Sequence, residues 1–155
     1  MTADGGASWQ DVSKGLPRKT IQRVHLSIHS PTRAYACLSG ANRGDHQPYV
    51  YVSNDFGSSW RSIASGLPTR GVNVLVESSS NPMHLYVATD LGVYESRDAG
   101  ATWSSLSKSL PTVPVMDLAL HEEEGSASTL IAVTHGLSAF SLRIEEARRT
   151  GPADD

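Results

Sequence analysis

The sequence predicts an all-β fold in which one small sheet is repeated along the chain, and three observations lead to it. An octet of the form S/T-x-D-x-G-x-S/T-W occurs three times, as TADGGASW, SNDFGSSW and SRDAGATW. Each octet is followed at the same distance by a Leu-Pro pair, at Leu16-Pro17, Leu67-Pro68 and Leu110-Pro111. Short apolar runs fill the intervals, and clusters of Gly, Pro, Asn and Ser separate them. An internal repeat of this kind determines the fold class before any other feature does.

The spacing of the octets corresponds to one blade of a β-propeller. Their tryptophans lie at positions 9, 60 and 103, so the steps are 51 and 43 residues, and a four-stranded blade takes about 40–45 residues. The longer step is explained by an insertion in one loop, Ser39 to Pro48. We therefore predict a β-propeller segment of about three four-stranded blades with a turn at each octet. A sandwich of short strands is the weaker alternative, because it would not require a fixed period.

The strands of each unit are expected in the same order. The alternating first run predicts strands at Val24 to Ile28, Val72 to Val76 and Val115 to Leu120. The second strands are expected at Ala34 to Leu38, Leu85 to Thr89 and Leu130 to Thr134. The third strands are expected at Tyr49 to Val52, Val93 to Glu95 and Ala139 to Leu142. The fourth strands should begin at the octet tryptophan and end near Gly15, Gly66 and Ser109.

These strands define the expected domain boundaries. The repeats cover residues 1–142, in blade units of about 10–60, 61–103 and 104–142. Residues 1–12 contain a candidate closing strand, Ser8 to Val12, which would complete the last blade. The charged tail 143–155 is expected to be disordered. Twelve strands make three blades, fewer than the usual four to eight. The chain is therefore interpreted either as part of a larger propeller, which its start within a motif favours, or as a ring completed by self-association.

The residue types of the octet suit a tight turn rather than catalysis. Carboxylates that can accept backbone N–H groups are placed at Asp4, Asp55 and Asp98. Glycines that permit positive φ are placed at Gly6, Gly57 and Gly100. Hydroxyls that can bind the turn backbone are placed at Ser8, Ser59 and Thr102. Large apolar side chains that should attach each turn to its own blade are placed at Trp9, Trp60 and Trp103.

The octet resembles the Asp-box, or bacterial neuraminidase repeat, over nearly all of residues 2–142. That motif marks the turn between the third and fourth strands of blades in sialidases, xyloglucanases, sortilin-type receptors and photosystem II assembly factors. The resemblance implies a structural role, remote from any active site. The last unit is similar to the closing blade of bacterial sortilin-like and glycosyl-hydrolase-like propellers. Thr134-His135-Gly136 fits that pattern, but Leu137 stands where an arginine is usual.

Composition excludes some functions and leaves the compartment open. The net charge is −3 without a basic run, which argues against nucleic acid as a partner. Cys37 is the only cysteine, so we expect an inert buried thiol and no intrachain disulfide. No apolar stretch is long enough to span a membrane, and no signal peptide is recognised. An exported parent protein would place the chain outside the cell or in the periplasm.

Candidate sites are few. His25 and His29 would lie about 13 Å apart on a strand at ~3.3 Å per residue, so they cannot share an ion. Glu122 to Glu124 are expected to form a solvated acidic loop. No metal, cofactor or catalytic residue is assigned, and Asp90 and Asp117 are the only aspartates outside the octets at plausible strand ends of the later units.

One face of the segment is the best candidate for binding. In an up-and-down blade, loops after the second and fourth strands share a face opposite the octets, and recognition residues usually lie in such loops. The candidates on this face are Arg43, Asp45, His46, Arg70, Asp90 and His135. We predict a non-catalytic scaffold or binding module for a protein or a glycan. The alternative is part of a sialidase-like or xyloglucanase-like glycoside hydrolase.

Overall fold

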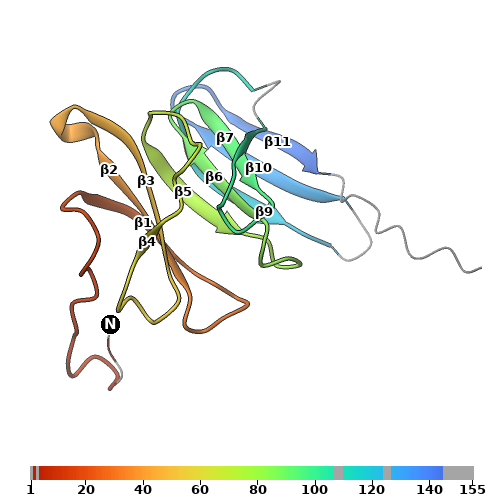
Figure 1. Ribbon diagram of the computed structural model, residues 1–155. Coiled ribbons are helices and arrows are strands. Elements are labelled where there is room, and N and C mark those ends of the chain that lie inside the picture. The colour runs from red at the N-terminus through yellow and green to blue at the C-terminus, as the bar shows by residue number, and fades with distance from the viewer. Residues whose placement is uncertain (1, 3, 107–109, 124–126, 145–155) are drawn as a thin grey trace, which may run out of the picture.

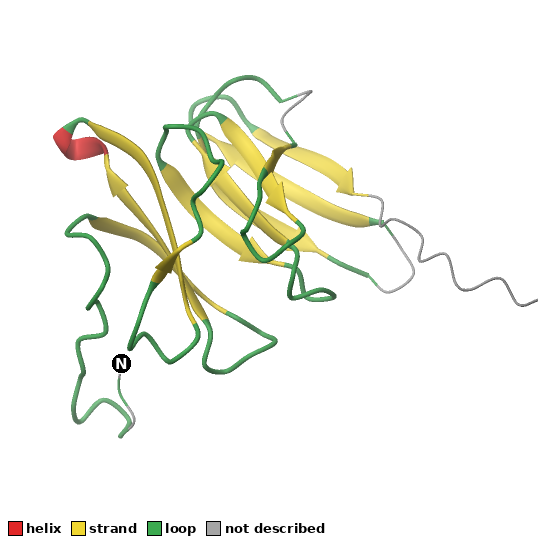
Figure 2. Ribbon diagram, viewed as in Figure 1, coloured by secondary structure: helices red, strands yellow, loops and turns green. Residues whose placement is uncertain are grey.

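The described part of the chain folds into three antiparallel sheets that stack face to face (Figures 1 and 2). The computed structural model describes residues 2, 4–106, 110–123 and 127–144. The first sheet contains β1 (Thr20–Leu26), β2 (Ala34–Gly40), β3 (Asp45–Ser53) and β4 (Arg61–Ser62). The second contains β5 (Val72–Glu77), β6 (Leu85–Thr89), β7 (Gly92–Ser96) and β8 (Ser104–Ser105). The third contains β9 (Val115–His121), β10 (Ser128–Thr134) and β11 (Ala139–Ile144).

Each sheet has the up-and-down order of a propeller blade, which confirms the predicted fold class. Strands that follow one another in sequence are hydrogen-bonded neighbours in all three sheets. The register also repeats, because the first and second strands pair Val24 with Ala36, Leu75 with Val87 and Leu118 with Ala132. An irregularity in this pairing follows Ile21, Val72 and Val115, the positions that the repeat aligns.

The apolar core lies between the sheets and consists of two clusters. The first joins the first and second sheets and includes Tyr35, Cys37, Val50, Leu75 and Val87. The second joins the second and third sheets and includes Val74, Tyr86, Val93, Leu118 and Leu130. Because each sheet is only one layer thick, its apolar residues are covered only where another sheet packs on it. Each stacked face is therefore also an interface that a neighbouring blade must cover.

Cys37 lies within the first of these clusters. Its side chain is buried, and burial raises the pKa of the thiol to about 12. A thiol in this environment stays protonated and is a weak nucleophile. The structure thus agrees with the inert buried cysteine expected from the sequence.

The insertion from Ser39 to Pro48 is not simply a loop, contrary to expectation. β2 continues through Gly40, a 3₁₀ turn (η1) spans Ala41–Arg43, and β3 already begins at Asp45. Gly44 closes the turn with a φ of 70°, which glycine adopts without strain. The extra residues therefore lengthen one β-hairpin, visible as the helical turn at its tip in Figure 2.

Two other strand expectations are corrected by the structure. Ser8 to Val12 has no strand assignment, and the third sheet has three strands among the described residues. The fourth strands β4 and β8 are only two residues long. Just after them, Ile63 N donates to Val50 O and Leu106 N donates to Val93 O, and the chain then turns away from the third strand.

The expected charged tail overlaps the last strand. Arg143 and Ile144 belong to β11 and pair with Thr129 and Ser128. The remainder of that tail, residues 145–155, lies outside the described residues.

Candidate functional site

All three octets form the same hydrogen-bonded turn. In the second octet, Ser53 Oγ accepts the N–H of Gly57 at 2.8 Å, and Asp55 Oδ1 accepts the N–H of Ser59 at 2.9 Å. The corresponding distances are 2.8 and 2.8 Å in the third octet and 2.9 and 3.0 Å in the first. In each octet the hydroxyl at the seventh position also donates to the aspartate, from Ser8, Ser59 and Thr102.

These contacts keep the octet aspartates ionised. The hydroxyl of Thr102, and then its backbone N–H, lower the pKa of Asp98 to about 2. Hydrogen bonds from Ser8 and Ser59 likewise hold the pKa values of Asp4 and Asp55 below their usual range. A carboxylate with a lowered pKa is a poor proton donor near neutral pH. The chemistry of the octets is therefore that of a turn and not of a general acid.

The octets lie at the same end of the sheets as the loops that follow the first strands (Figure 1). Phe56 N donates to Thr32 O at 2.9 Å, and Ala99 N donates to Met83 O at 2.8 Å. Phe56 and Ala99 adopt φ values of 57° and 55°, which are strained for residues with a side chain. This strain was not evident from the sequence, because the octet pattern leaves that position unspecified.

The glycine and tryptophan of each later octet contact the segment that precedes their own sheet in the chain. Trp103 Nε1 donates to Ile63 O at 2.7 Å, and Trp60 Nε1 donates to Val12 O at 2.8 Å. A Cβ added to Gly100 would lie 2.9 Å from Ile63 Cβ. Besides the predicted attachment of each turn to the blade, the indole N–H reaches back to the segment before that sheet.

The same close approach occurs at the second octet. A Cβ added to Gly57 would lie 2.9 Å from Val12 Cβ. Glycine is needed at both positions for backbone conformation and for space, since φ is 83° at Gly57 and 86° at Gly100. The first octet differs, because a Cβ at Gly6 would meet only Trp9 Nε1 at 4.0 Å, and the Trp9 side chain is 76% exposed.

The six residues of the predicted binding face lie at the ends of strands. Arg43 is in the 3₁₀ turn, Asp45 and His46 begin β3, and Arg70 lies just before β5. Asp90 lies between β6 and β7, and His135 lies between β10 and β11. In each sheet the connection after the second strand contacts the segment before the first strand. The contact is Asp45 with Lys19 in the first sheet and Asp90 N with Gly71 O in the second. In the third sheet it is His135 N with Pro114 O.

Asp45 is held by residues of β3 and by Lys19, which lies just before β1. Its carboxylate pairs with Lys19 Nζ at 2.5 Å and accepts bonds from Tyr49 Oη at 2.7 Å and Gln47 N at 3.0 Å. Hydrogen bonding, first from Lys19, holds the pKa of Asp45 below its usual range, and the same bond raises the pKa of Lys19. Asp45 therefore has structural partners that account for its charge.

The other predicted residues divide into bound and exposed groups. Asp90 Oδ1 accepts Asn73 Nδ2 at 3.2 Å, and the same amide donates to Val115 O at 2.8 Å, which ties the second sheet to the third. Arg70 donates to the carbonyl of neighbouring Thr69 at 2.8 Å. Arg43, His46 and His135 are exposed.

Two glutamates connect neighbouring sheets, and the sequence had pointed only to the second of them, Glu122, as part of an acidic loop. The buried carboxylate of Glu77 accepts Tyr35 Oη at 2.8 Å and Ile28 N at 3.2 Å. Burial, and then this bond, raise the pKa of Tyr35. His29 also crosses this interface, with Nε2 2.8 Å from Ser78 O.

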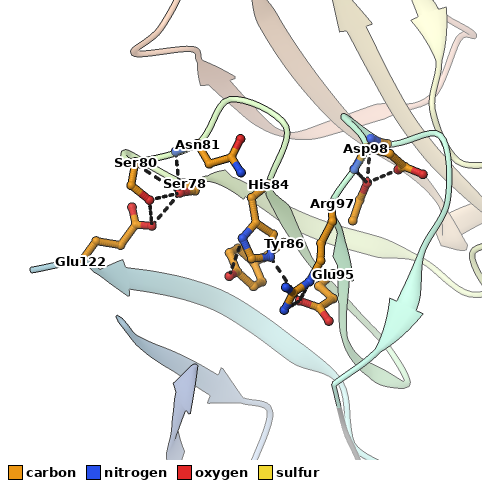
Figure 3. A network of polar contacts seen from close by, with 11 residues as sticks. Ser78, Ser80, Asn81, His84, Tyr86, Glu95, Arg97, Asp98 and Glu122 are labelled. Carbon is orange, nitrogen blue, oxygen red and sulfur yellow. Dashed lines mark hydrogen bonds and ion pairs between the residues drawn. The ribbon is translucent and has the colours of Figure 1, made fainter. Parts of the chain in front are cut away.

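Glu122 connects the second and third sheets in a similar way (Figure 3). Its carboxylate accepts hydroxyl bonds from Ser78, Ser79 and Ser80 at 2.6, 2.6 and 3.0 Å. Burial opposes ionisation of Glu122, but these bonds outweigh it and lower its pKa. The expectation of a simply solvated acidic loop is therefore wrong for Glu122, while Glu124 lies outside the described residues.

An exposed apolar surface lies on the first sheet, on the side away from the second. We call it the apolar face and define it by Ile21, Val24, Leu26, Ala34 and Ala36. Together with the N-terminal segment and Trp60, these residues line a groove of about 540 Å³. Ile21, Val24 and Leu26 are 48%, 53% and 70% exposed.

The described part of the chain lacks two further features. It contains no group of three or more His, Cys, Asp or Glu residues that could hold a metal ion. It also contains no helix that is long and apolar enough to cross a membrane.

Comparison with known proteins extends the fold assignment. No protein-family model matches the sequence, and no curated protein matches it. Among solved structures, the chain is similar to the GH74 xyloglucanase from Xanthomonas campestris, with a TM-score of 0.53 and 16% identity over 78% of this chain and 19% of that enzyme. An ancestral GH74 enzyme matches with a TM-score of 0.49 and 17% identity over 80% of this chain and 20% of its own.

These neighbours are β-propeller glycoside hydrolases. At this level of identity the likeness shows the fold, which is that of β-propeller blades. The chain spans about a fifth of the length of the first two structures that it matches.

Proposed function

We propose that this chain is a non-catalytic part of a larger β-propeller ring and that it binds a polypeptide through the apolar face. The supporting observation is a contrast between equivalent positions of the repeat. Val72 and Leu75 are 0% and 1% exposed beneath the first sheet, whereas their counterparts Ile21 and Val24 are about half exposed. Contiguous exposed apolar surface marks interaction sites in soluble proteins.

The octets fit the same proposal as structural turns of the Asp-box type. Their carboxylates, hydroxyls and glycines are used within the turn, and Trp60 and Trp103 bind the preceding repeat. The aspartates of the loop face have structural partners too, Lys19 for Asp45 and Asn73 for Asp90. A carboxylate that is held by structural partners in this way is poorly placed to act as a catalytic acid, which favours a scaffold.

A photocrosslinking experiment tests the binding surface. We would place p-benzoylphenylalanine at Leu26 on the apolar face and, as a control, at the exposed Met83 in the loop between β5 and β6. Irradiation should give a polypeptide adduct from position 26 only, and Val24→Lys should remove it. Equal adducts from both positions, or none from position 26, would contradict the proposal.

The second candidate function is part of a glycoside hydrolase, favoured by the likeness to a xyloglucanase. Glycan contact would then involve the loop face, with Arg43, His46 and His135 exposed on it. Incubation with xyloglucan oligosaccharides and fluorogenic sialosides distinguishes the two functions. The scaffold should give no turnover. Turnover that is lost in Asp90→Asn or Asp117→Asn would establish the hydrolase instead.

A further inference from the structure

We propose that the polypeptide bound by the apolar face is a second copy of this chain, and that two copies close one ring by sharing strands. Residues 9–13 of each copy would add to β11 of the other as its missing fourth strand. This inference rests on the proposed function and names the partner for the same surface. Three separate features of the described residues support it.

The first feature is that the N-terminal segment makes the same contacts as a fourth strand and the turn after it. Val12 O accepts a hydrogen bond from the indole N–H of Trp60, in the same way that Ile63 O accepts one from the indole N–H of Trp103. The following turns also match, since Leu16 N donates to Ser13 O at 3.0 Å and Leu67 N donates to Ala64 O at 3.1 Å. The segment thus lies against the first sheet as the outer strand of a preceding blade would, although it has no strand assignment itself.

The second feature is the edge of the third sheet, where β11 is the last of the described strands. In the complete sheets the third and fourth strands pair Val52 with Arg61 and Glu95 with Ser104. The repeat places Ser141 in the position of Val52 and Glu95, and Gln10 in the position of Arg61 and Ser104. The proposed register therefore sets Gln10 of one copy opposite Ser141 of the other.

The same register provides a backbone bond for the shared strand. Ile63 N donates to Val50 O, and Leu106 N donates to Val93 O, both at 2.9 Å. By the repeat, Val12 N of one copy would donate to Ala139 O of the other. Addition of a strand to a sheet edge is a common mode of polypeptide binding, because backbone bonds supply affinity.

The third feature is a small cavity at the position that a tryptophan fills elsewhere. Trp103 packs against a cluster that includes Val50, Ile63 and Leu67. Their counterparts Val93, Leu106 and Leu110 line a cavity of about 80 Å³ between the second and third sheets. We infer that this cavity receives the exposed Trp9 of the second copy, whose indole would donate to Leu106 O.

The two faces that would meet are apolar on both sides. The outer side of the third sheet presents Ile131 and Val133 of β10, both exposed. They occupy the repeat positions of Tyr35 and Cys37, which cover the second sheet in the first core cluster. In the closed ring they would cover Ile21 and Val24 in the same manner.

The number of copies follows from the number of sheets. The described residues of one copy form three sheets, whereas closed propellers have about four to eight blades. The N-terminal segment and β11 lie at opposite ends of the molecule (Figure 1), so one copy does not join them. Two copies joined head to tail give six blades, with two identical interfaces related by a twofold axis.

Light scattering tests the stoichiometry. We expect a molar mass of twice 16.6 kDa, and Val24→Lys should reduce it to the mass of one copy. Met83→Lys introduces the same charge at an exposed apolar position of the second sheet and should leave the dimer intact. A wild-type chain that is monomeric at every concentration, or a Val24→Lys chain that remains dimeric, would overturn the proposal.

Paired cysteines test the register independently of the mass. Residues directly opposite in an antiparallel pair have Cβ atoms about 4.5–5.5 Å apart, so Gln10→Cys with Ser141→Cys should form a covalent dimer on oxidation. Asp11→Cys with Ser141→Cys is shifted by one residue and should not. Equal crosslinking of both pairs, or none of the first, would contradict the shared strand.

The photocrosslinking from position 26 distinguishes failure of this inference from failure of the proposed function. Adducts with peptides of this chain support the second copy. Adducts with another polypeptide leave the proposed function standing and refute the second copy. The absence of any adduct refutes both.

Discussion

At the scale of single residues, the octet glycines combine two requirements that are usually separate. Gly57 and Gly100 adopt positive φ, and each also faces a side chain of the preceding repeat at a distance that a Cβ would violate. The first octet has the backbone requirement alone, since Gly6 has a φ of 97° without a neighbour from another repeat. The chain therefore contains its own control for the steric effect.

We predict that Gly100→Ala destabilises the protein more than Gly6→Ala. Both substitutions impose positive φ on alanine, at a cost of about 1–2 kcal/mol. Gly100→Ala also forces Ile63 to move, which adds about 1–3 kcal/mol of overpacking. Urea unfolding measures both free energies. Equal losses in the two variants would show that contact with the preceding repeat is unimportant.

The octet aspartates predict how stability depends on pH. The pKa of Asp98 is about 2 in the folded protein and 3.8 in the reference state. Because the folded pKa is the lower one, its hydrogen bonds stabilise the fold fully above about pH 4, the usual range of an unfolded aspartate. That stability is lost as the pH falls toward 2.

This dependence can be assigned with one variant. The unfolding free energy of the wild type should fall between pH 5 and pH 2 more steeply than that of Asp98→Asn, which has no carboxylate to protonate. Urea titrations at several pH values measure the two slopes. Identical slopes would mean that Asp98 does not contribute to the acid sensitivity.

At the scale of elements, polar contacts between sheets supplement the apolar clusters. Glu77 reaches the first sheet from the second, and Glu122 reaches the second from the third. Each carboxylate comes from the end of a first strand or the loop just after it. The stacking of the sheets is therefore specified by charge-assisted hydrogen bonds as well as by burial.

We expect Glu122→Ala to destabilise the chain by about 1–3 kcal/mol, the usual cost of losing hydrogen bonds to a charged group. Three serine hydroxyls would lose their acceptor, and the third sheet would lose one of its polar contacts with the second. Glu123→Ala, at the exposed neighbouring position, should be close to neutral. Urea unfolding of both variants decides this, and equal stability would show that the serine contacts add nothing.

The sequence predicted strand bounds well where a sheet is covered on both faces, and less well in the sheets at the two ends of the stack of three. The expected strand at Leu85 to Thr89 coincides with β6, which is buried on both sides. β1 begins four residues before the expected Val24 and ends at Leu26. The apolar pattern there extends to Ile28, two residues beyond the strand. It therefore indicates which residues form the apolar face and not where the strand ends. The two-residue edge strands β4 and β8 are too short to show an alternating apolar pattern in the sequence.

At the scale of the whole molecule, the three-blade segment could be predicted because the octets repeat with nearly constant spacing. Contacts between repeats could not be predicted, since the proximity of Gly100 to Ile63 becomes visible only when the sheets are stacked. For the candidate site, the sequence indicated which loops share a face. It did not indicate that Asp45 and Asp90 are held by Lys19 and Asn73. It also gave no indication of the apolar groove, because exposure depends on which sheet lies next to Val24.

The central claim is that the indole of each octet binds the repeat before it, and hydrogen exchange of the three indole N–H groups tests it most directly. In dilute solution, nuclear magnetic resonance should show slow exchange for Trp60 and Trp103, which donate to Val12 and Ile63. Trp9 should exchange fast in the single copy and slow down only as the proposed dimer forms. Exchange of Trp60 and Trp103 at the rate of free tryptophan would contradict the account.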